Sequence, residues 1–515
     1  MTQDLTGRRG LRLTLLCVGV FMVYLDTTIV NVALPRIQTD LHADIVQLQW
    51  IVNAYALVFA CLLLTSGTLG DVFGRKRMFL GGLAGFTIAS ALCAVAPTIE
   101  LLLAARAVQG VFGSVMIPVS LALISGSYAD PVQRARAIGI WAGLGGVALA
   151  AGPVAGGLLV DQFGWQSIFW VNVPIGVLGF AALAAVIKES TPVPRKVDVP
   201  GQALFILAIA GATYGLIEGT KLGWGSAPIV TAFAVAAVSI VLFGVWEFRV
   251  PQPMLPVSFF RNRVVVVAAL VNFLALFGPY ASLFLLTLYL QSVNHLTAIQ
   301  AGLSFLPITV AIMVASYVAS MLAARYKPRW LIVIGSVLAA GGLLGFTVLQ
   351  VGSGFGAYWW SMALVGVGGS MCGAPATVAM MSAVQPQQAG AASGVSNTFR
   401  QVGTVFGTAL GGTLLLSYMR GALPSALSAS SLPPDVQASA LATVSNGSLT
   451  PIAAAQSVTG QIFVDGMHLV MVVAAAGTLV GGLVALLFLT SRPKAASSGS
   501  TSSADASTTT ATANR

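Results

Sequence analysis

Fourteen apolar runs restrict the fold of this chain more than any other feature. Each run is 19 to 27 residues long, and a helix needs roughly 20 apolar residues to cross a membrane. The runs are continuously apolar instead of alternating, which excludes barrel strands. We therefore predict an all-α integral membrane protein with spans at 13–34, 48–69, 78–96, 99–124, 137–160, 166–187, 200–219, 227–246, 264–290, 299–323, 330–350, 357–383, 392–417 and 467–490.

The distribution of Lys and Arg predicts the orientation of these spans. If the N-terminus is cytoplasmic, 20 of the 25 basic residues lie in cytoplasmic segments and three lie outside; two, Arg106 and Arg400, lie within spans. This bias agrees with the positive-inside rule, so both termini are expected in the cytoplasm. The net charge of +10 does not indicate a nucleic-acid partner, because the basic residues form short clusters between apolar runs.

The segments outside the spans are short, with two exceptions. Residues 419–462 are rich in Ser, Ala and Pro, and we interpret them as an outer cover with room for a short amphipathic helix. Residues 491–515 have low complexity and are predicted to be a disordered cytoplasmic tail. The four cysteines lie inside apolar runs without CxxC spacing and the three histidines are scattered, so neither a disulfide nor a metal site is expected.

Two opposite charges are predicted at the same depth in the membrane. Asp26, in the stretch LDTTIVNVALP, lies eight residues from the outer end of the first span, and Arg106 lies about seven residues from the outer end of the fourth. At 1.5 Å per residue they are roughly 12 and 10 Å deep. A carboxylate there costs several kcal/mol and usually faces an internal cavity. The pair is either a static link between two spans or a proton site in which Arg106 tunes Asp26 or relays its proton.

The cytoplasmic loop GTLGDVFGRKR, residues 67–77, carries the first recognisable motif. Its glycines permit a tight turn, its aspartate can pair with a basic residue, and its cations suit the inner surface. The string could be an ordinary basic loop, but it resembles the signature loop of the major facilitator superfamily. That resemblance implies a gate that locks and releases the cytoplasmic side. The residues concerned are Gly67, Asp71, Gly74, Arg75 and Arg77. SMLAARYKPRW, residues 320–330, is a weaker echo that lacks the aspartate.

The fifth span contains a second motif, GPxxGG. It resembles the antiporter motif of proton-coupled exporters in the same superfamily, in which tight helix packing blocks a leak. Its residues here are Gly152, Pro153, Gly156 and Gly157, and Ala148 stands where a glycine is usual. LLAARAVQGVFG, residues 102–113, is similar to the fourth-helix motif, and LDTTIVNVALP to the first-helix motif of the fourteen-helix drug:proton antiporters. The resemblance covers residues 10–490.

The resemblance implies a major facilitator fold of two six-helix bundles, residues 13–187 and 264–490. The linker 188–263 would add two spans between them, and residues 1–12 would be a cytoplasmic N-terminus. It further implies a monomeric, proton-coupled antiporter, without enzymatic activity or cofactor, in a bacterial inner membrane. Such a protein exports lipophilic, often cationic, compounds by alternating access. The alternative is a dedicated exporter of one natural product, lipid or amino acid.

Under this interpretation Asp26 takes a proton when the cavity opens outward. When the cavity opens inward, Asp26 loses that proton and its negative charge attracts the substrate. The predicted cavity residues are Thr27, Asn31, Tyr55, Gln109 and Trp141. Trp50 and Phe59 are further candidate cavity aromatics, and packing or interfacial anchoring is the alternative for all four aromatic residues. Arg400 is expected to extend toward the inner surface. Glu218 and Asp465 lie near the outer ends of their helices and are expected to be solvated, with a second proton site as the alternative for either.

Overall fold

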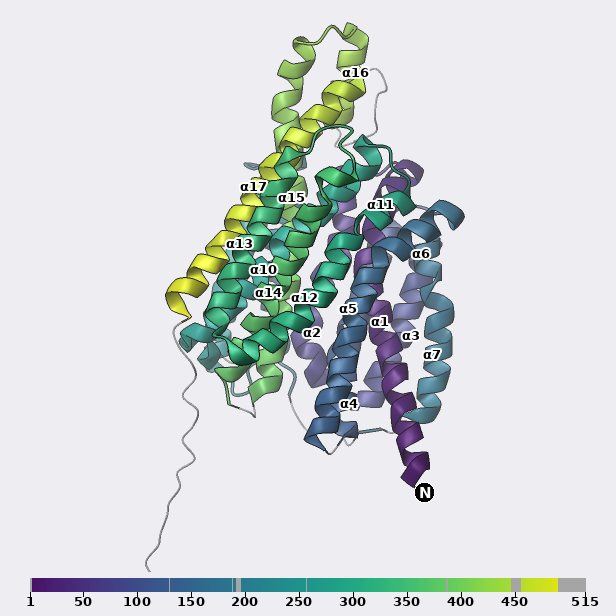
Figure 1. Ribbon diagram of the computed structural model, residues 1–515, viewed down its shortest axis with the longest axis vertical. Helices are drawn as coiled ribbons and strands as arrows, with labels where there is room; N and C mark the ends of the chain where they lie inside the picture. Colours follow the sequence, from purple (N-terminus) through teal and green to yellow (C-terminus); the bar gives the residue numbers. More distant parts are fainter. Residues whose placement is uncertain are drawn as a thin grey trace, which may run out of the picture.

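The computed structural model describes residues 2–128, 130–187, 189–190, 196–255, 257–385, 388–445 and 455–489. All regular elements in these residues are helical (Figure 1). Fourteen helical segments within them are long and apolar enough to cross a membrane, which confirms the predicted spans. The predicted disordered tail, 491–515, lies outside the described residues.

The first six spans are built from seven helices. The sixth span is divided by a turn into two of these, α6 and α7. An aspartate caps α2, and another precedes the proline that opens α5, which satisfies amide groups that a helix start leaves free. The helices are α1 (Thr2–Leu41), α2 (Ile45–Phe73), α3 (Arg75–Ala94), α4 (Ile99–Ser127), α5 (Pro131–Phe163), α6 (Ser167–Trp170) and α7 (Asn172–Val186). The segment expected to precede the first span is thus helical and continuous with it.

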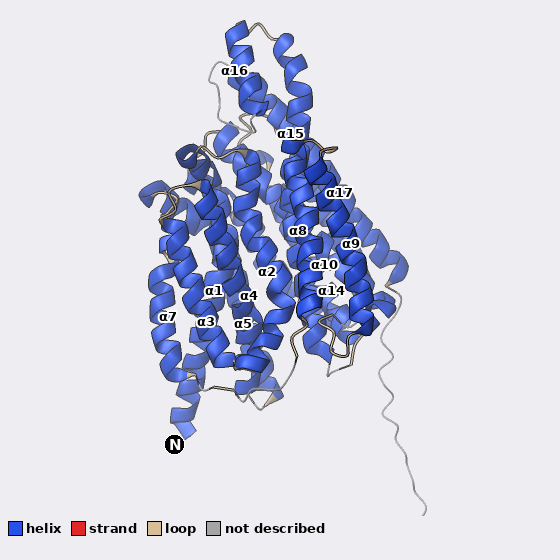
Figure 2. Ribbon diagram, turned by 180° about the vertical axis from the view of Figure 1, so that it is seen from behind, coloured by secondary structure: helices blue, strands red, loops and turns tan. Residues whose placement is uncertain are grey.

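Two helices separate this group from the remaining spans, as the fold prediction required. They are α8 (Val199–Leu222) and α9 (Ala227–Arg249). α8 packs against α2, α15 and α9, so it touches both groups (Figure 2). Apolar side chains of α9, including Val238, Val241 and Phe248, are exposed, as expected of a helix that faces lipid.

The last six spans follow after the short helix η1 (Val257–Arg261). They comprise α10 (Arg263–Leu288), η2 (Tyr289–Val293), α11 (Ala298–Ser304), α12 (Leu306–Arg325), α13 (Pro328–Gly345), η3 (Phe346–Val348), η4 (Phe355–Ala357), α14 (Trp359–Ser382), α15 (Ala389–Ser428), α16 (Pro434–Ser445) and α17 (Gln456–Phe488).

The predicted outer loop, 419–462, is largely helical, which corrects the boundaries of two spans. α15 runs on to Ser428 and α17 already begins at Gln456, so both helices extend beyond the bundle beside α16 (Figure 1). The extension continues the helical apolar period: Met419, Leu423 and Leu427 are buried at intervals of four residues. Residues 446–454 of this loop lie outside the described part.

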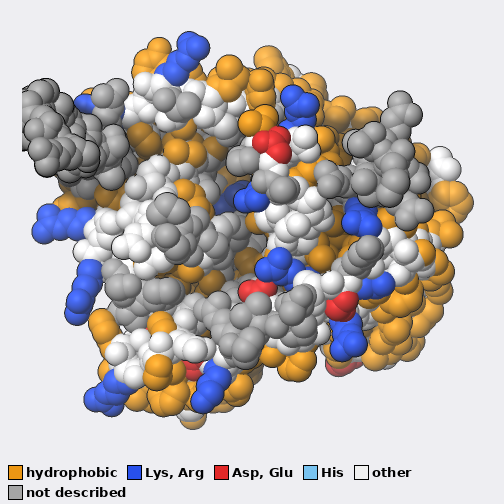
Figure 3. Space-filling model, turned by 90° about the horizontal axis from the view of Figure 1, so that it is seen from below, with side chains coloured by type: hydrophobic (Ala, Val, Ile, Leu, Met, Phe, Trp, Pro, Cys, Tyr) orange, Lys and Arg blue, Asp and Glu red, His pale blue; other side chains and the backbone are white. Residues whose placement is uncertain are grey.

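α1 begins and α17 ends at the same end of the bundle (Figure 1). Seen from that end, Lys and Arg side chains are more numerous than acidic ones (Figure 3). Arg249, Arg261, Arg263, Arg325 and Lys327 are exposed. This is the charge distribution that the positive-inside rule associates with the cytoplasmic face.

The two groups of six spans are hydrogen-bonded to each other near the opposite end, where α1 finishes. Gln291 Nε2 donates to the Val32 carbonyl at 2.9 Å, and Gln49 Nε2 donates to the Ala409 carbonyl at 2.7 Å. Asp161, near the end of α5, accepts two amide N–H groups at the start of α11, at 3.0 and 2.9 Å. Among the described residues, every hydrogen bond between α1–α7 and α10–α17 lies toward this end.

Candidate transport site

A cavity of about 310 Å³ lies between the two groups of six spans. Its volume is in the range of small-molecule sites, which are mostly apolar with a few polar groups. The apolar walls come from α1, α2, α4 and α5 on one side and from α10, α12, α14 and α15 on the other. Hydroxyl and amide groups are scattered among them. The polar lining residues are Tyr24, Thr27, Thr28, Tyr280, Thr309, Ser316, Ser370, Asn397, Arg400 and Gln401.

Of the residues that the structure describes, Arg400 is the single charged one that lines this cavity. It stands nine residues into the span that starts at Ala391, about 14 Å deep at 1.5 Å per residue. Its side chain lines the cavity, which corrects the expectation that Arg400 extends to the inner surface instead of lining a site. Within the described residues it makes no salt bridge and no side-chain hydrogen bond.

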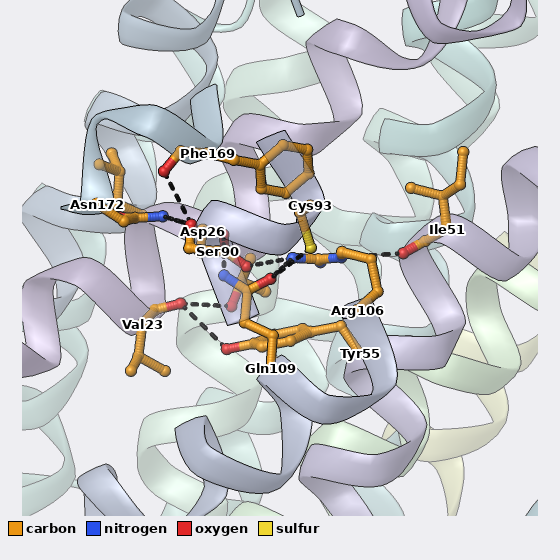
Figure 4. A network of polar contacts seen from close by, with 12 residues as sticks. Val23, Asp26, Ile51, Tyr55, Ser90, Cys93, Arg106, Gln109, Phe169 and Asn172 are labelled. Atoms are coloured by element: carbon orange, nitrogen blue, oxygen red, sulfur yellow. Dashed lines mark hydrogen bonds and ion pairs between the residues drawn. The ribbon is translucent and has the colours of Figure 1, made fainter. Parts of the chain in front are cut away.

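Asp26 and Arg106 form an ion pair, as their matching depths predicted. Arg106 Nη1 lies 2.5 Å from Asp26 Oδ2 and also donates to Gln109 Oε1 at 2.8 Å. Gln109 Nε2 in turn donates to Asp26 Oδ1 at 3.0 Å, and Arg106 Nε donates to the Ile51 carbonyl at 3.3 Å. The pair therefore lies in a closed ring of charge-assisted hydrogen bonds (Figure 4).

Further groups complete the surroundings of the pair (Figure 4). Asn172 Nδ2 donates to Asp26 Oδ1 at 3.4 Å and to Ser90 Oγ at 3.1 Å. Tyr55 lies with its ring 4.4 Å from the Arg106 guanidinium carbon, within range of a cation–π interaction. The network thus joins α1, α2, α3, α4 and α7, all from the first six spans.

The pair is sealed from the cavity in this conformation. Asp26 is 0% exposed and Arg106 is 1% exposed, and neither lines the cavity. Because successive residues of a helix point about 100° apart, Thr27 and Thr28 face the cavity while Asp26 faces α4. The expectation that Asp26 itself attracts the substrate is therefore wrong for this state, and the arrangement observed is that of an ion pair between spans.

Of the five predicted cavity residues, Thr27 alone lines the cavity. Asn31 donates to backbone carbonyls of its own helix, and Trp141 Nε1 donates to Ser120 Oγ at 3.0 Å. Tyr55 and Gln109 belong to the sealed network. Phe59, a further candidate cavity aromatic for which packing was the alternative, is a lining residue, as are Tyr24, Asn397 and Gln401. The polar run SNTFRQ, residues 396–401, within an apolar span was the signal that could have revealed the last two.

The loop between α2 and α3 is tied to its own half of the bundle. Asp71 Oδ1 accepts from Arg75 Nη2 at 2.9 Å, and Arg75 Nη1 donates to the Ala122 carbonyl of α4 at 3.2 Å. Gly74 has φ +94°, a backbone conformation that side chains disfavour. Gly67 packs near a proline of α4.

The start of α3 in this loop is capped by the segment that follows α7. Glu189 accepts the amide N–H groups of Lys76 and Arg77 at 3.0 and 3.2 Å, and Ser190 Oγ accepts that of Arg75 at 2.9 Å. All polar contacts of the loop within the described residues therefore lie inside the first six spans and the segment that directly follows α7. No hydrogen bond among them joins the loop to the second group of spans.

The GPxxGG motif packs α5 closely on α1. A Cβ at Gly152 would overlap the Thr28 hydroxyl, and one at Gly156 would come within 2.8 Å of Ile29 Cγ1. Only glycine permits this approach, since small residues bring helix backbones together.

The same motif also packs α5 on α11, across the two groups of spans. A Cβ at Gly157 would overlap the Ala298 carbonyl, and one at Gly302 of α11 would overlap the carbonyl of Pro153. The two helices are thus in backbone contact just below the hydrogen bonds made by Asp161. Pro153 also lines the cavity, so the motif separates the cavity from that end of the bundle.

Comparison with known proteins agrees with this architecture. Residues 16–408 match the Major Facilitator Superfamily. The chain belongs to this superfamily. Its solved neighbours within the fold include a bacterial homologue of the human lysosomal transporter Spinster in an inward-facing, unoccupied conformation. That structure matches with a TM-score of 0.67 at 15% identity, over 94% of this chain and 97% of the other.

Relatives of this superfamily member carry names that refer to drug resistance. The methylenomycin A resistance protein of Streptomyces coelicolor is 38% identical over 80% of this chain and 87% of its own length. The tetracenomycin C resistance and export protein of Streptomyces glaucescens is 33% identical over 95% and 94%. The multidrug resistance protein Stp of Mycobacterium tuberculosis is 36% identical over 84% and 80%.

Membership of the superfamily decides several expectations. The chain is a multi-pass membrane transporter with bacterial relatives, not an enzyme. Drug:proton antiporters of the superfamily need no cofactor. The two acids considered as second proton sites, Glu218 and Asp465, do not line the cavity. Glu218 accepts from Trp50 Nε1 at 2.8 Å and Asp465 accepts from Gln461 Nε2 at 3.0 Å.

Proposed function

We propose that this protein exports lipophilic small molecules across the bacterial cytoplasmic membrane in exchange for protons, acting as a monomer. The observation that carries the proposal is the similarity, over 95% of the chain, to a protein named for resistance to and export of tetracenomycin C. A cavity of drug-like size between the two halves supports it.

The proposed cycle alternates access between the two ends of the bundle. The end that carries the basic residues is assigned to the cytoplasm, so that both termini are cytoplasmic. The hydrogen bonds of Asp161, Gln49 and Gln291 then close the outer end, while the loop at 67–77 is released from the second half. Substrate would enter this state from the cytoplasm and leave after the outer contacts open.

In this proposal the proton acts on Asp26 without direct contact between Asp26 and the substrate. A proton on Asp26 would remove the charge that holds Arg106 and loosen α1 against α4. Because Thr27 and Thr28 belong to the same helical turn and line the cavity, movement of α1 would reshape the substrate site. The network must reach water in another conformation for the proton to exchange.

Inverted membrane vesicles with an imposed pH gradient test the function. Wild-type protein should accumulate lipophilic dyes when the gradient is applied, and Asp26→Asn should abolish this accumulation. Asp40→Asn is the matched control, since Asp40 lies on the same helix in an exposed pair with Arg36. Absence of gradient-driven uptake by the wild type, over a broad dye panel, would refute export; full uptake by Asp26→Asn would refute the coupling role.

A dedicated exporter of one natural product is the second candidate. The names of two relatives, each referring to a single antibiotic, favour it. A susceptibility panel separates the candidates, because a dedicated exporter protects cells against one chemical scaffold and a multidrug exporter against several.

A further inference from the structure

The two arginines inside the membrane have opposite surroundings. Arg106 is enclosed by a carboxylate, an amide oxygen and a backbone carbonyl. Arg400 is half-buried in the cavity wall and, among the described residues, has no acidic partner. A guanidinium at the centre of a membrane is expensive and is normally paired or placed in a water-filled cavity.

The cavity around Arg400 offers no negative charge. Among the described residues, its lining contains neither Asp nor Glu, and no second cation. Tyr24 and Tyr280, from opposite halves, lie within electrostatic reach of the guanidinium. Gln401 also lines the cavity and its side-chain amide has no hydrogen-bond partner in the described part of the chain. Within the described residues, the site therefore presents one unpaired cation together with neutral amide and hydroxyl groups, among which the Gln401 amide is free to bond to a ligand.

We propose that Arg400 recognises an acidic group on the cargo, so that the preferred substrates are lipophilic anions, with a carboxylate or ionised phenol on an apolar body. A guanidinium binds a carboxylate through two parallel hydrogen bonds, and the apolar walls suit the remainder of such a molecule. A cationic cargo would meet a like charge that nothing in the lining neutralises. This inference rests on the proposed export function and replaces the expectation of often cationic substrates.

Direct binding measurements in detergent test the inference independently of transport. The probes are a lipophilic fluorophore bearing a carboxylate, its neutral methyl ester, and a cationic fluorophore of similar size. Arg400→Gln should raise the Kd of the carboxylate probe at least about tenfold, the smallest effect expected for losing a charge-assisted hydrogen bond. The ester should be unaffected. Arg400→Lys should retain part of the affinity, and Arg36→Gln, at an exposed arginine, should change nothing.

The same probes in inverted vesicles distinguish the failure of this inference from that of the proposed function. If the wild type accumulates the cation in preference to the carboxylate, the inference is wrong while export stands. Equal losses for carboxylate and ester in Arg400→Gln, with Arg400→Lys behaving as wild type, would show that Arg400 supports the fold and overturn it. If a pH gradient drives no probe into wild-type vesicles, the proposed function itself fails.

Discussion

Removing one charge from the sealed network should cost far more stability than removing both. Asp26→Asn leaves Arg106 with Gln109 Oε1 and the Ile51 carbonyl but without a counter-charge, at a site that is 1% exposed. Breaking a buried pair in this way typically costs about 3–5 kcal/mol. Arg106→Gln leaves the carboxylate unpaired and should cost a similar amount.

The double variant Asp26→Asn/Arg106→Gln contains neither buried charge. Replacing a whole buried pair by neutral groups is often close to neutral in stability, so the double variant should regain most of what each single variant loses. The interaction energy from the double-mutant cycle should therefore be at least about 3 kcal/mol, near the lower cost of breaking such a pair. Unfolding of the purified protein by denaturant in detergent measures the three differences. Additive losses, with the double variant the least stable, would refute the energetic reasoning.

Transport by the same double variant separates the two roles left open by the sequence. If the pair is only a static link between α1 and α4, a stable double variant should export substrate under a pH gradient as the wild type does. If Asp26 carries the coupling proton, the double variant should be folded and bind substrate but fail to use the gradient. Measuring binding and gradient-driven uptake on one preparation gives the answer without confusing instability with lost coupling.

Three further substitutions test the packing described above. Gly157→Val should separate α5 from α11, because the added side chain would overlap backbone atoms of α11. Liposomes that contain this variant should then dissipate a pH gradient faster than liposomes that contain the control Gly143→Ala, since nothing lies within 4 Å of a Cβ at Gly143. Gly74→Ala should lower the free energy of unfolding by on the order of 1–3 kcal/mol, because a side chain at φ +94° strains the backbone. Denaturant unfolding measures this loss. The control Gly81→Ala should leave the free energy of unfolding unchanged, because its Cβ would meet open space. Asp161→Ala removes both acceptors at the start of α11 and should speed amide hydrogen exchange there; unchanged exchange would contradict the proposed outer closure.

Span number could be predicted from the sequence because it depends on local composition. Fourteen runs of sufficient length became fourteen helical spans. The ends of α15 and α17 could not be predicted in the same way. Both helices continue beyond the apolar run, since Met419, Leu423 and Leu427 bury one face in contacts with distant parts of the chain that a hydropathy count does not detect.

Depth in the membrane was predictable for Asp26 and Arg106, but the direction of their side chains was not. Depth follows from position along a helix, whereas direction depends on how each helix is rotated against its neighbours. A difference of one residue, about 100°, decides that Thr27 faces the cavity and Asp26 does not. Tyr55 and Gln109 were misplaced for this reason, because both point into the sealed network. Asn31 lies only about 40° from Thr27 around α1, but it is one turn nearer the end where α1 finishes and does not line the cavity. Arg400 was misjudged because its distance from the helix start was read as a position near the surface.

The positions of the two intramembrane cations suggest that cargo selection and energy coupling are separable. Arg400 lines the cavity beside apolar walls that include Pro153 of the GPxxGG motif, whereas Asp26 and Arg106 are enclosed by helices of the first six spans on the other side of α1. If both proposals hold, Arg400→Gln should change which compounds are exported and leave gradient-driven uptake of a neutral probe intact. Asp26→Asn should instead stop gradient-driven uptake of every probe. If a variant at either position altered both the choice of compounds and the uptake of a neutral probe, proton and substrate would act on one shared group. The sealed position of Asp26 does not allow this in the conformation observed.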